Sequence, residues 1–378
     1  MITYLDNSAT TKPDEQVANK VYEMLCEKFG NPSSFHRAGL DAMLEVKSAR
    51  ASIAKALSCQ EDEIIFTSGG TEANNLAIFG AVEANKRKGK RIVTTKIEHE
   101  SVLGAVNYLE NEGYDVVYLD VDSFGNINPD QLYQAITKDT ILVSMMYVNN
   151  EVGSILPVKE IAKAVKKAGA PALIHIDCVQ AFGKIDVKPS KLGADLVTIT
   201  AHKIHGPKGI GALYIKKGVR IVPRTYGGEQ EKRMRPGTES SPLIAGFGKA
   251  VELIPNLKTQ SQQIKELNQY AKEKLEAIDG VKINSSPDAS DYIINLYVPT
   301  FMTSQTVVQH LSSQYSVYVS NGSACAKGKK SHVLTARRLP DNIIEKSIRI
   351  SFSRDTTKED INQLVFALSE TVKTHPEK

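Results

Sequence analysis

The 378-residue sequence lacks tryptophan, has only four cysteines and contains no long apolar run. Without an apolar stretch of roughly 18 residues, no transmembrane helix is expected. The N-terminus, MITYLDNSATTKP, also lacks a basic segment followed by an apolar one, so we expect no secretory signal. A strong charge bias is missing as well, since the formal net charge is only +4 and the basic runs are short. These absences favour a cytoplasmic protein that binds neither membranes nor, as its main activity, nucleic acids.

The four cysteines are widely spaced and form no CxxC pair, which argues against a disulfide framework and a zinc site. A lone cysteine is most often a small buried apolar residue, and we expect this for Cys26, Cys59 and Cys178. Cys325 differs because it lies in VSNGSACAKGKKSHVL, where nearby lysines favour the thiolate. Soluble proteins tend to avoid an exposed thiol without a role. We therefore interpret Cys325 as a nucleophile.

The length predicts about two domains. From about residue 60, short β-branched runs alternate with helical patterns, which is typical of βαβ units on a largely parallel sheet. After residue 255 or so, a long polar helix, short strands and further helices predict a smaller α+β domain. We expect a large domain over 16–255, a small domain over 256–378, and an N-terminal segment over 1–15 that packs with the small domain. The expected strands of the large domain are EIIF from 63, RIVTT from 91, DVVYL from 115, ILVSMMY from 141, ALIHI from 172, DLVTI from 195 and GALYI from 211.

Three polar segments follow expected strands, at the edge where α/β sheets bind their ligands. SGGTEANNLA over 68–77 would expose backbone N–H groups at a helix start and suit a phosphate, although such turns are often purely structural. Asp177 could supply a counter-charge to a protonated ring nitrogen, or simply cap the next helix. Lys203, in TAHKIHGPKG, suits a Schiff base because desolvation would lower its pKa, but surface lysines are far commoner than catalytic ones.

Taken in order, these segments resemble a cysteine desulfurase of the NifS/IscS type, within the class V aminotransferase superfamily. The resemblance covers nearly the whole chain. It implies a fold-type I α/β enzyme dependent on pyridoxal 5′-phosphate, with a mostly parallel seven-stranded sheet in the large domain and a smaller α+β domain. The segments that carry it are YLDNSATT, FGNPSSFHRAG, FTSGGTEANNLA, IEHESV, VNNEVG, HIDCVQ, AHKIHGPKGIGALY, RPGTES, GSAC and SIRISFSR.

The resemblance also implies roles for residues at matching positions. Lys203 would form the Schiff base with the cofactor and remove the substrate Cα proton, while Cys325 would take sulfur from L-cysteine as a persulfide and leave L-alanine. His99 would stack on the cofactor ring and could relay protons. Thr238 would reach the phosphate of the neighbouring subunit, which implies a homodimer with shared active sites. Asp177 would pair with the ring nitrogen of the cofactor, and Gln180 would hydrogen-bond to its ring hydroxyl. Asn150 and Arg349 would hold the substrate carboxylate, and Asn150 would also contact the cofactor. The residues that would bind the cofactor phosphate are Gly70, Thr71, Thr200 and His202.

The sulfur acceptor stays open at this point. The segment between Cys325 and SHVL is about two residues shorter than the IscS-like pattern and more basic, so the resemblance does not identify the acceptor. An iron–sulfur scaffold, a tRNA-thiolation enzyme and a cofactor-biosynthesis carrier are the alternatives. Another fold-type I reaction, selenocysteine cleavage or transamination, would use Lys203 and Asp177 without needing Cys325. A non-catalytic scaffold that kept the fold is the alternative from a different class.

Overall fold

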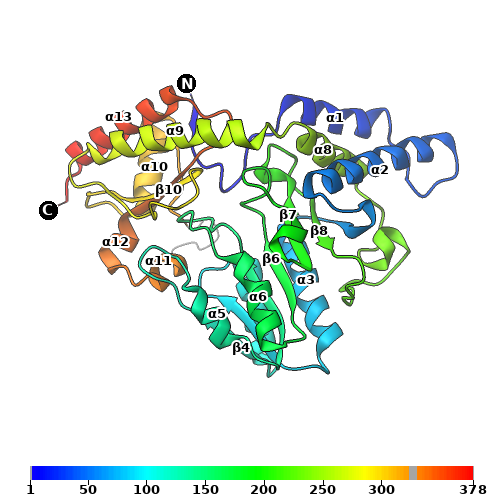
Figure 1. The fold of residues 1–378 in the computed structure, drawn as a ribbon. Coiled ribbons are helices and arrows are strands. Elements are labelled where there is room, and N and C mark those ends of the chain that lie inside the picture. Colours follow the sequence, from blue (N-terminus) through cyan, green and yellow to red (C-terminus); the bar gives the residue numbers. More distant parts are fainter. Residues whose placement is uncertain (1, 323–329, 378) are drawn as a thin grey trace.

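The chain folds around a large seven-stranded β-sheet and a small three-stranded one, which lie at different ends of the molecule in Figure 1. The computed structural model describes residues 2–322 and 330–377. Cys325, the expected nucleophile, lies outside the described residues.

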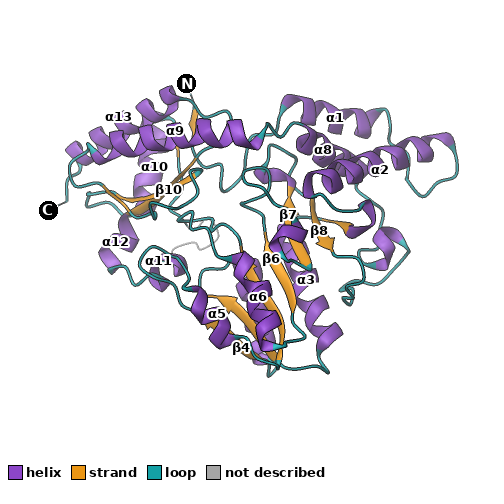
Figure 2. Cartoon of the chain, in the orientation of Figure 1, coloured by secondary structure: helices purple, strands orange, loops and turns teal. Residues whose placement is uncertain are grey.

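The large sheet has seven strands in the order β2-β8-β7-β6-β5-β3-β4, drawn as orange arrows in Figure 2. All its strands run parallel except β8, which is antiparallel to both of its neighbours. The expected mostly parallel seven-stranded sheet is thereby confirmed. The first strand starts one residue later than predicted, because Glu63 ends a short 3-10 turn. The strands are β2 (Ile64–Thr67), β3 (Arg91–Thr95), β4 (Asp115–Leu119), β5 (Thr140–Met146), β6 (Leu173–Asp177), β7 (Leu196–Thr200) and β8 (Gly211–Ile215).

Helices cover both faces of this sheet, so its central strands β5, β6 and β7 are buried along nearly their whole length. In β3, Ile92 belongs to the buried cluster beneath one helical layer and Val93 to the cluster on the opposite face. This alternation follows from the two-residue period of a strand. One layer contains α3 (Gly70–Asn85) and α4 (Glu100–Asn111), and the other contains α5 (Pro129–Ala135) and α6 (Val158–Ala168).

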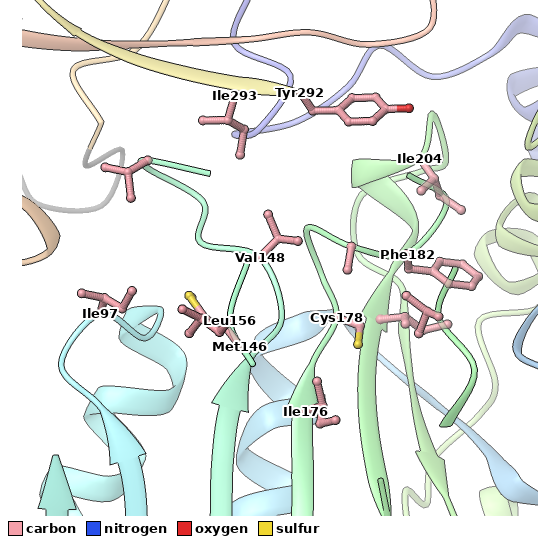
Figure 3. Packing of buried hydrophobic residues seen from close by; sticks show 14 of the residues in the cluster. Ile97, Met146, Val148, Leu156, Ile176, Cys178, Phe182, Ile204, Tyr292 and Ile293 are labelled. Atoms are coloured by element: carbon pink, nitrogen blue, oxygen red, sulfur yellow. The ribbon is translucent and has the colours of Figure 1, made fainter. Parts of the chain in front are cut away.

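The small sheet is antiparallel and has the strand order β12-β10-β9. A further parallel pair joins the N-terminal β1 to β11. The buried cluster of the large sheet continues into the small one, and Figure 3 shows Tyr292 and Ile293 beyond the carboxyl ends of β5 and β6. The expected domain boundary near 255 therefore stays a prediction. These strands are β1 (Thr3–Tyr4), β9 (Lys282–Ile283), β10 (Ile293–Tyr297), β11 (Val317–Tyr318) and β12 (Ser347–Ser351), and the helices beside them are α9 (Leu257–Glu276), α10 (Ser304–Tyr315), α11 (His332–Ala336), α12 (Asp341–Lys346) and α13 (Lys358–Thr374).

Three further helices pack together, with α8 in contact with both α1 and α2, and their buried side chains join the core of the large sheet. They are α1 (Glu15–Cys26), α2 (Arg37–Leu57) and α8 (Ser241–Glu252), and the short α7 (Pro189–Leu192) lies elsewhere. Within the described part of the chain, no helix is both long and apolar enough to cross a membrane.

The expectation that three cysteines are buried is correct only for Cys178. Cys59 is partly buried, and Cys26 is exposed. Met24 points into the α1, α2 and α8 bundle, and Cys26 follows two residues later. Because successive helical residues are about 100° apart, a residue two positions on faces away from the same contact.

The close approach of α2 and α8 yields a stability prediction. A Cβ atom added at Gly248 would lie 2.5 Å from the Cα atom of Ala49, so Gly248→Ala should push the helices apart. We expect a loss of about 1–3 kcal/mol in the free energy of unfolding, measured by chemical denaturation.

Gly104→Ala is the matched control, because Gly104 lies on the exposed face of α4 and an added Cβ would meet no atom within 4 Å. This change should instead stabilise the protein by about 0.5–1 kcal/mol, since alanine favours the helix more than glycine does. Equal effects of the two changes would contradict the proposed packing constraint.

Candidate active site

A cavity of about 290 Å³ opens at the carboxyl ends of β5, β6 and β7. The N-terminal segment around Ser8 closes one side, and Arg349 from β12 of the small sheet closes another. Its lining includes ten residues singled out in the sequence: Gly70, Thr71, His99, Asn150, Asp177, Gln180, Thr200, His202, Lys203 and Arg349.

One end of the cavity is suited to an anion. Helix α3 begins at Gly70, so its first backbone N–H groups and the positive end of its dipole face this end. The preceding Gly69 has φ +155°, a value that favours glycine. Thr200 and His202 approach from the end of β7. Burial and the nearby Lys203 ammonium lower the pKa of His202 to about 3, so this ring is neutral and can act as a donor.

The carboxylate of Asp177 is held at the end of β6 by two donors. The side-chain amide of Asn74 donates to Oδ2 at 2.8 Å, and the backbone N–H of Val179 donates to Oδ1 at 2.9 Å. Of the two alternatives that the sequence left open, helix capping is not observed, because the chain after Asp177 forms a turn and the next helix, α7, begins only at Pro189. Asp177 is thus a fixed negative charge in the wall of the cavity.

The same Asn74 links Asp177 to His99. Its amide also donates to Ser101 Oγ at 2.9 Å, and Ser101 Oγ lies 2.8 Å from His99 Nδ1. The backbone N–H of Ser101 donates to His99 Nδ1 as well, at 3.1 Å. Nδ1 is therefore the acceptor, which leaves the proton of the neutral ring on Nε2. Burial lowers the pKa of His99 and favours this neutral form.

Lys203 ends a 3-10 turn directly after β7, and its amine contacts the N-terminal segment. Nζ donates to the backbone carbonyl of Ser8 and, at 2.7 Å, to that of Ala9. Gln180 Nε2 donates to the same Ser8 carbonyl at 2.9 Å. Burial, followed by the nearby Arg349 and Lys184 cations, lowers the pKa of Lys203 to about 7. A sizeable fraction of the amine is therefore unprotonated near neutral pH, as a nucleophile or base requires.

Arg349 is buried and presents a partly free guanidinium edge. Nη1 donates to the carbonyl of Asn150 at 2.9 Å, and Nη2 forms an ion pair with Asp6 at 2.6 Å. Nε has no hydrogen-bond partner among residues 2–322 and 330–377. A planar carboxylate accepts from such an edge through both oxygens, so the arrangement fits an anionic ligand.

One sequence-predicted site residue, Thr238, does not line this cavity, and another, Cys325, cannot be placed relative to it. Thr238 is exposed in the segment before α8 and does not line it. Cys325 lies outside the described residues, although Gly322 and His332 on either side of that segment both line the cavity.

Sequence reasoning missed several residues of the site. Asp6 and Ser8 lie in YLDNSATT, which was recognised without a role, and they meet Arg349 and Lys203 only across the fold. Glu151 is buried beside the cavity, where burial raises its pKa, and it accepts from Ser331 Oγ at 2.5 Å. The sequence indicated Glu151 only through its position directly after Asn150, a residue already expected in the site.

Known proteins resemble the chain over nearly its full length. Residues 3–364 match the family described as aminotransferase class-V. The cysteine desulfurase IscS of Dictyoglomus turgidum is 42% identical over 368 residues, which cover 95% of this chain and 91% of that relative. A solved structure of a NifS-like protein has 35% sequence identity and a TM-score of 0.93, covering 99% of this chain and 100% of its own. A structure of SspA in complex with cysteine has 33% identity and a TM-score of 0.82, covering 94% of this chain and all of its own.

The low pKa of Lys203 can be measured by competitive labelling with acetic anhydride in ligand-free protein. Because only the unprotonated amine reacts, labelling of Lys203 should rise with a midpoint near pH 7, whereas ordinary lysines have midpoints near pH 10.4. Arg349→Gln should move the Lys203 midpoint to higher pH, since it removes a neighbouring cation. Mass spectrometry resolves the labelled positions, and a wild-type midpoint above about pH 9 would contradict the site's electrostatics.

Proposed function

The chain belongs to the aminotransferase class-V family and is a cysteine desulfurase, and on this premise we propose how its residues act. The substrate is L-cysteine, the product is L-alanine, and the sulfur is transferred to Cys325. The observation that carries this assignment is the buried Lys203 amine with its pKa near 7, in one cavity with the fixed Asp177 carboxylate and Arg349.

Pyridoxal 5′-phosphate fits the donors and acceptors of the cavity. Its phosphate would bind the N-terminus of α3 at Gly70 and Thr71, together with Thr200 and His202. Asp177 would pair with the ring nitrogen, and Gln180 Nε2 would donate to the ring oxygen. Lys203 would be the point of attachment, and His99 would lie against the ring. When bound, this cofactor supplies an electron sink for the substrate Cα.

Arg349 and Asn150 would receive the substrate carboxylate. The free Nε of Arg349 and the adjacent Nη2, now paired with Asp6, form the edge that a carboxylate accepts from. Lys203, partly unprotonated at neutral pH, would then remove the Cα proton. His99 carries its proton on Nε2 and could return a proton to the substrate.

Cys325 would perform the sulfur transfer. Its thiolate attacks the substrate sulfur, a sulfur–sulfur bond forms, and the electron pair of the breaking Cβ–S bond goes to the substrate carbon. Protonation of that carbon gives alanine, and Cys325 keeps the sulfur as a persulfide. We propose that a cytoplasmic acceptor protein then takes this sulfur, either an iron–sulfur scaffold or a tRNA-thiolation enzyme.

A homodimer with shared active sites would explain the position of Thr238 and an exposed apolar surface. Thr238 lies outside the cavity of its own chain, where it is free to reach the phosphate site of a second copy. The bundle of α1 and α2 projects from the sheet in Figure 1 and exposes large apolar side chains, a composition typical of protein interfaces. These side chains are Tyr22, Leu25, Phe29, Phe35, Leu40, Met43 and Leu44.

Two variants separate the roles of lysine and cysteine. Lys203→Ala should lower kcat for alanine formation by about 10²–10⁴-fold, because it removes the proposed base. Cys325→Ala should reduce sulfide release from L-cysteine, measured with a thiol reductant present, to background. Cys26→Ala is the matched control, since that exposed thiol is remote from the proposed chemistry and its loss should change neither rate. Full sulfide release by Cys325→Ala would overturn the persulfide mechanism.

The shared-site arrangement predicts a dimer in analytical ultracentrifugation. Phe35, at 108% relative exposure, has no packing role within its own chain, so Phe35→Asp should leave the fold intact but shift the sedimenting species toward the monomer. The monomer should also retain less cofactor, because Thr238 of the second copy is withdrawn. Phe301→Asp alters an exposed phenylalanine elsewhere and should have no such effect. A fully active monomer would rule out shared sites.

A further inference from the structure

A second, much smaller cavity of about 20 Å³ adjoins the main one and shares Lys203 with it. It lies between the large sheet and the small one. Its lining combines residues that follow β6 and β7 with Gln260 of α9, and with Tyr292 and Phe352, which flank strands β10 and β12. Lys184, Gln260 and Tyr292 are the polar side chains of interest in that lining.

Two of these side chains bury a polar atom that has no protein partner. Gln260 is 6% exposed and Tyr292 is 4% exposed. Neither Gln260 Oε1 nor Tyr292 Oη has a hydrogen-bond partner within the described ranges 2–322 and 330–377. Leaving such groups unsatisfied in a protein interior is costly, so a buried pair that shares one cavity requires an explanation.

Lys184 brings spare donors to the same cavity. It is 6% exposed, and its ammonium has three N–H groups. One of them donates to Gln180 Oε1 at 3.1 Å, and Nζ lies 5.5 Å from the centre of the Tyr292 ring. Two N–H groups therefore remain for another acceptor nearby.

We infer that this cavity is a binding site for one structural water molecule that joins Lys184, Gln260 and Tyr292. A cavity needs roughly 10–15 Å³ and two to four polar partners to hold a water, and both conditions are met. The water accepts from Lys184 Nζ and donates to Gln260 Oε1 and Tyr292 Oη, which gives both unpaired oxygens a partner. A metal cation is excluded as the occupant, because Lys184, Lys203 and Arg354 all line the cavity.

The site also orients Gln180, which makes Lys184 a positioning residue. An ammonium only donates, so its partner on Gln180 must be the oxygen, and the amide nitrogen must point toward Ser8 and the main cavity. The chain of contacts runs from Tyr292 and Gln260 through the water and Lys184 to the Gln180 donor. This consequence rests on the proposed contact of Gln180 with the cofactor, whereas the water site itself does not.

Thermal unfolding of the holoenzyme tests the water site, because the proposal predicts whether Tyr292→Phe lowers or raises Tm. If Tyr292 Oη binds the water, Tyr292→Phe removes a hydrogen bond and should lower Tm by about 2 °C. If the hydroxyl has no partner at all, the same change removes an unsatisfied group and should raise Tm. Tyr270→Phe on α9 is the matched control and should lower Tm, since Tyr270 Oη donates to Asn362 at 2.6 Å. A higher Tm for Tyr292→Phe would overturn the proposal.

A crystal structure of the holoenzyme provides the direct check. Density for one water within about 2.7–3.2 Å of Lys184 Nζ, Gln260 Oε1 and Tyr292 Oη is the expected result. An empty cavity, or direct contacts among the three side chains, would overturn the site. This result is independent of cofactor chemistry, so it separates failure of the water site from failure of the proposed function.

The proposed role of Lys184 in orienting Gln180 can be tested by measuring the pH midpoint of the cofactor's visible absorbance. Lys184→Met should raise this midpoint by about 0.5–1 unit, because the donor from Gln180 to the ring oxygen is lost along with a nearby cation. In a Gln180→Leu background the same change should shift the midpoint much less. Equal shifts in both backgrounds would mean that Lys184 acts by charge alone and would overturn the positioning role. A protein without a visible cofactor band would instead refute the proposed function.

Discussion

The burial of three cations in one region is the constraint on which the active site depends. Lys184 and Arg349 lie close enough to Lys203 to lower its pKa. Burying a charged side chain without compensating partners costs free energy, so all three cations need such partners. The structure compensates with the carboxylates of Asp6 and Asp177 and with backbone carbonyls that accept from the cationic groups. The compensation is incomplete at Lys203, whose amine keeps a pKa near 7. A lysine with such a pKa has the unprotonated amine that the proposed roles of base and nucleophile require at neutral pH.

The compensating groups come from distant parts of the chain, which ties catalysis to the assembly of both sheets. The segment that holds Lys203 is itself held by β12, since Asn7 Nδ2 donates to the Ser351 carbonyl and the Ser8 N–H donates to Ser351 Oγ. Arg349 lies on the same strand and forms its ion pair with Asp6. One short N-terminal stretch thus connects Arg349 of the small sheet with Lys203 at the end of β7. The amine and the guanidinium group are positioned relative to each other by this stretch.

Most of the fold and much of the site follow from local patterns. Asp177 and Lys203 could be placed because each follows an apolar strand, and parallel strands bring their carboxyl ends to one edge. Contacts across the fold could not be placed in this way. Asn74 lies inside a helix with nothing in its neighbourhood to indicate that it joins Asp177 to Ser101, and Lys184 reads as a surface lysine until its burial is known. Cys26 is the opposite case, since it was predicted to be buried and is exposed. A position within a helix does not by itself reveal which face of the helix is covered.

The alternation of strands and helices, the order of the chemical motifs and hence the family could be inferred from the amino-acid sequence, because each depends on residues that are close along the chain. The sequence also indicated which side chains could carry the reaction. Only the tertiary structure decided their protonation and orientation: the neutral His202, the Nε2 proton of His99, the amide direction of Gln180 and the weakened basicity of Lys203. These properties depend on burial and on charges at a few ångströms, and groups at such distances in space are often more than a hundred residues apart in the chain.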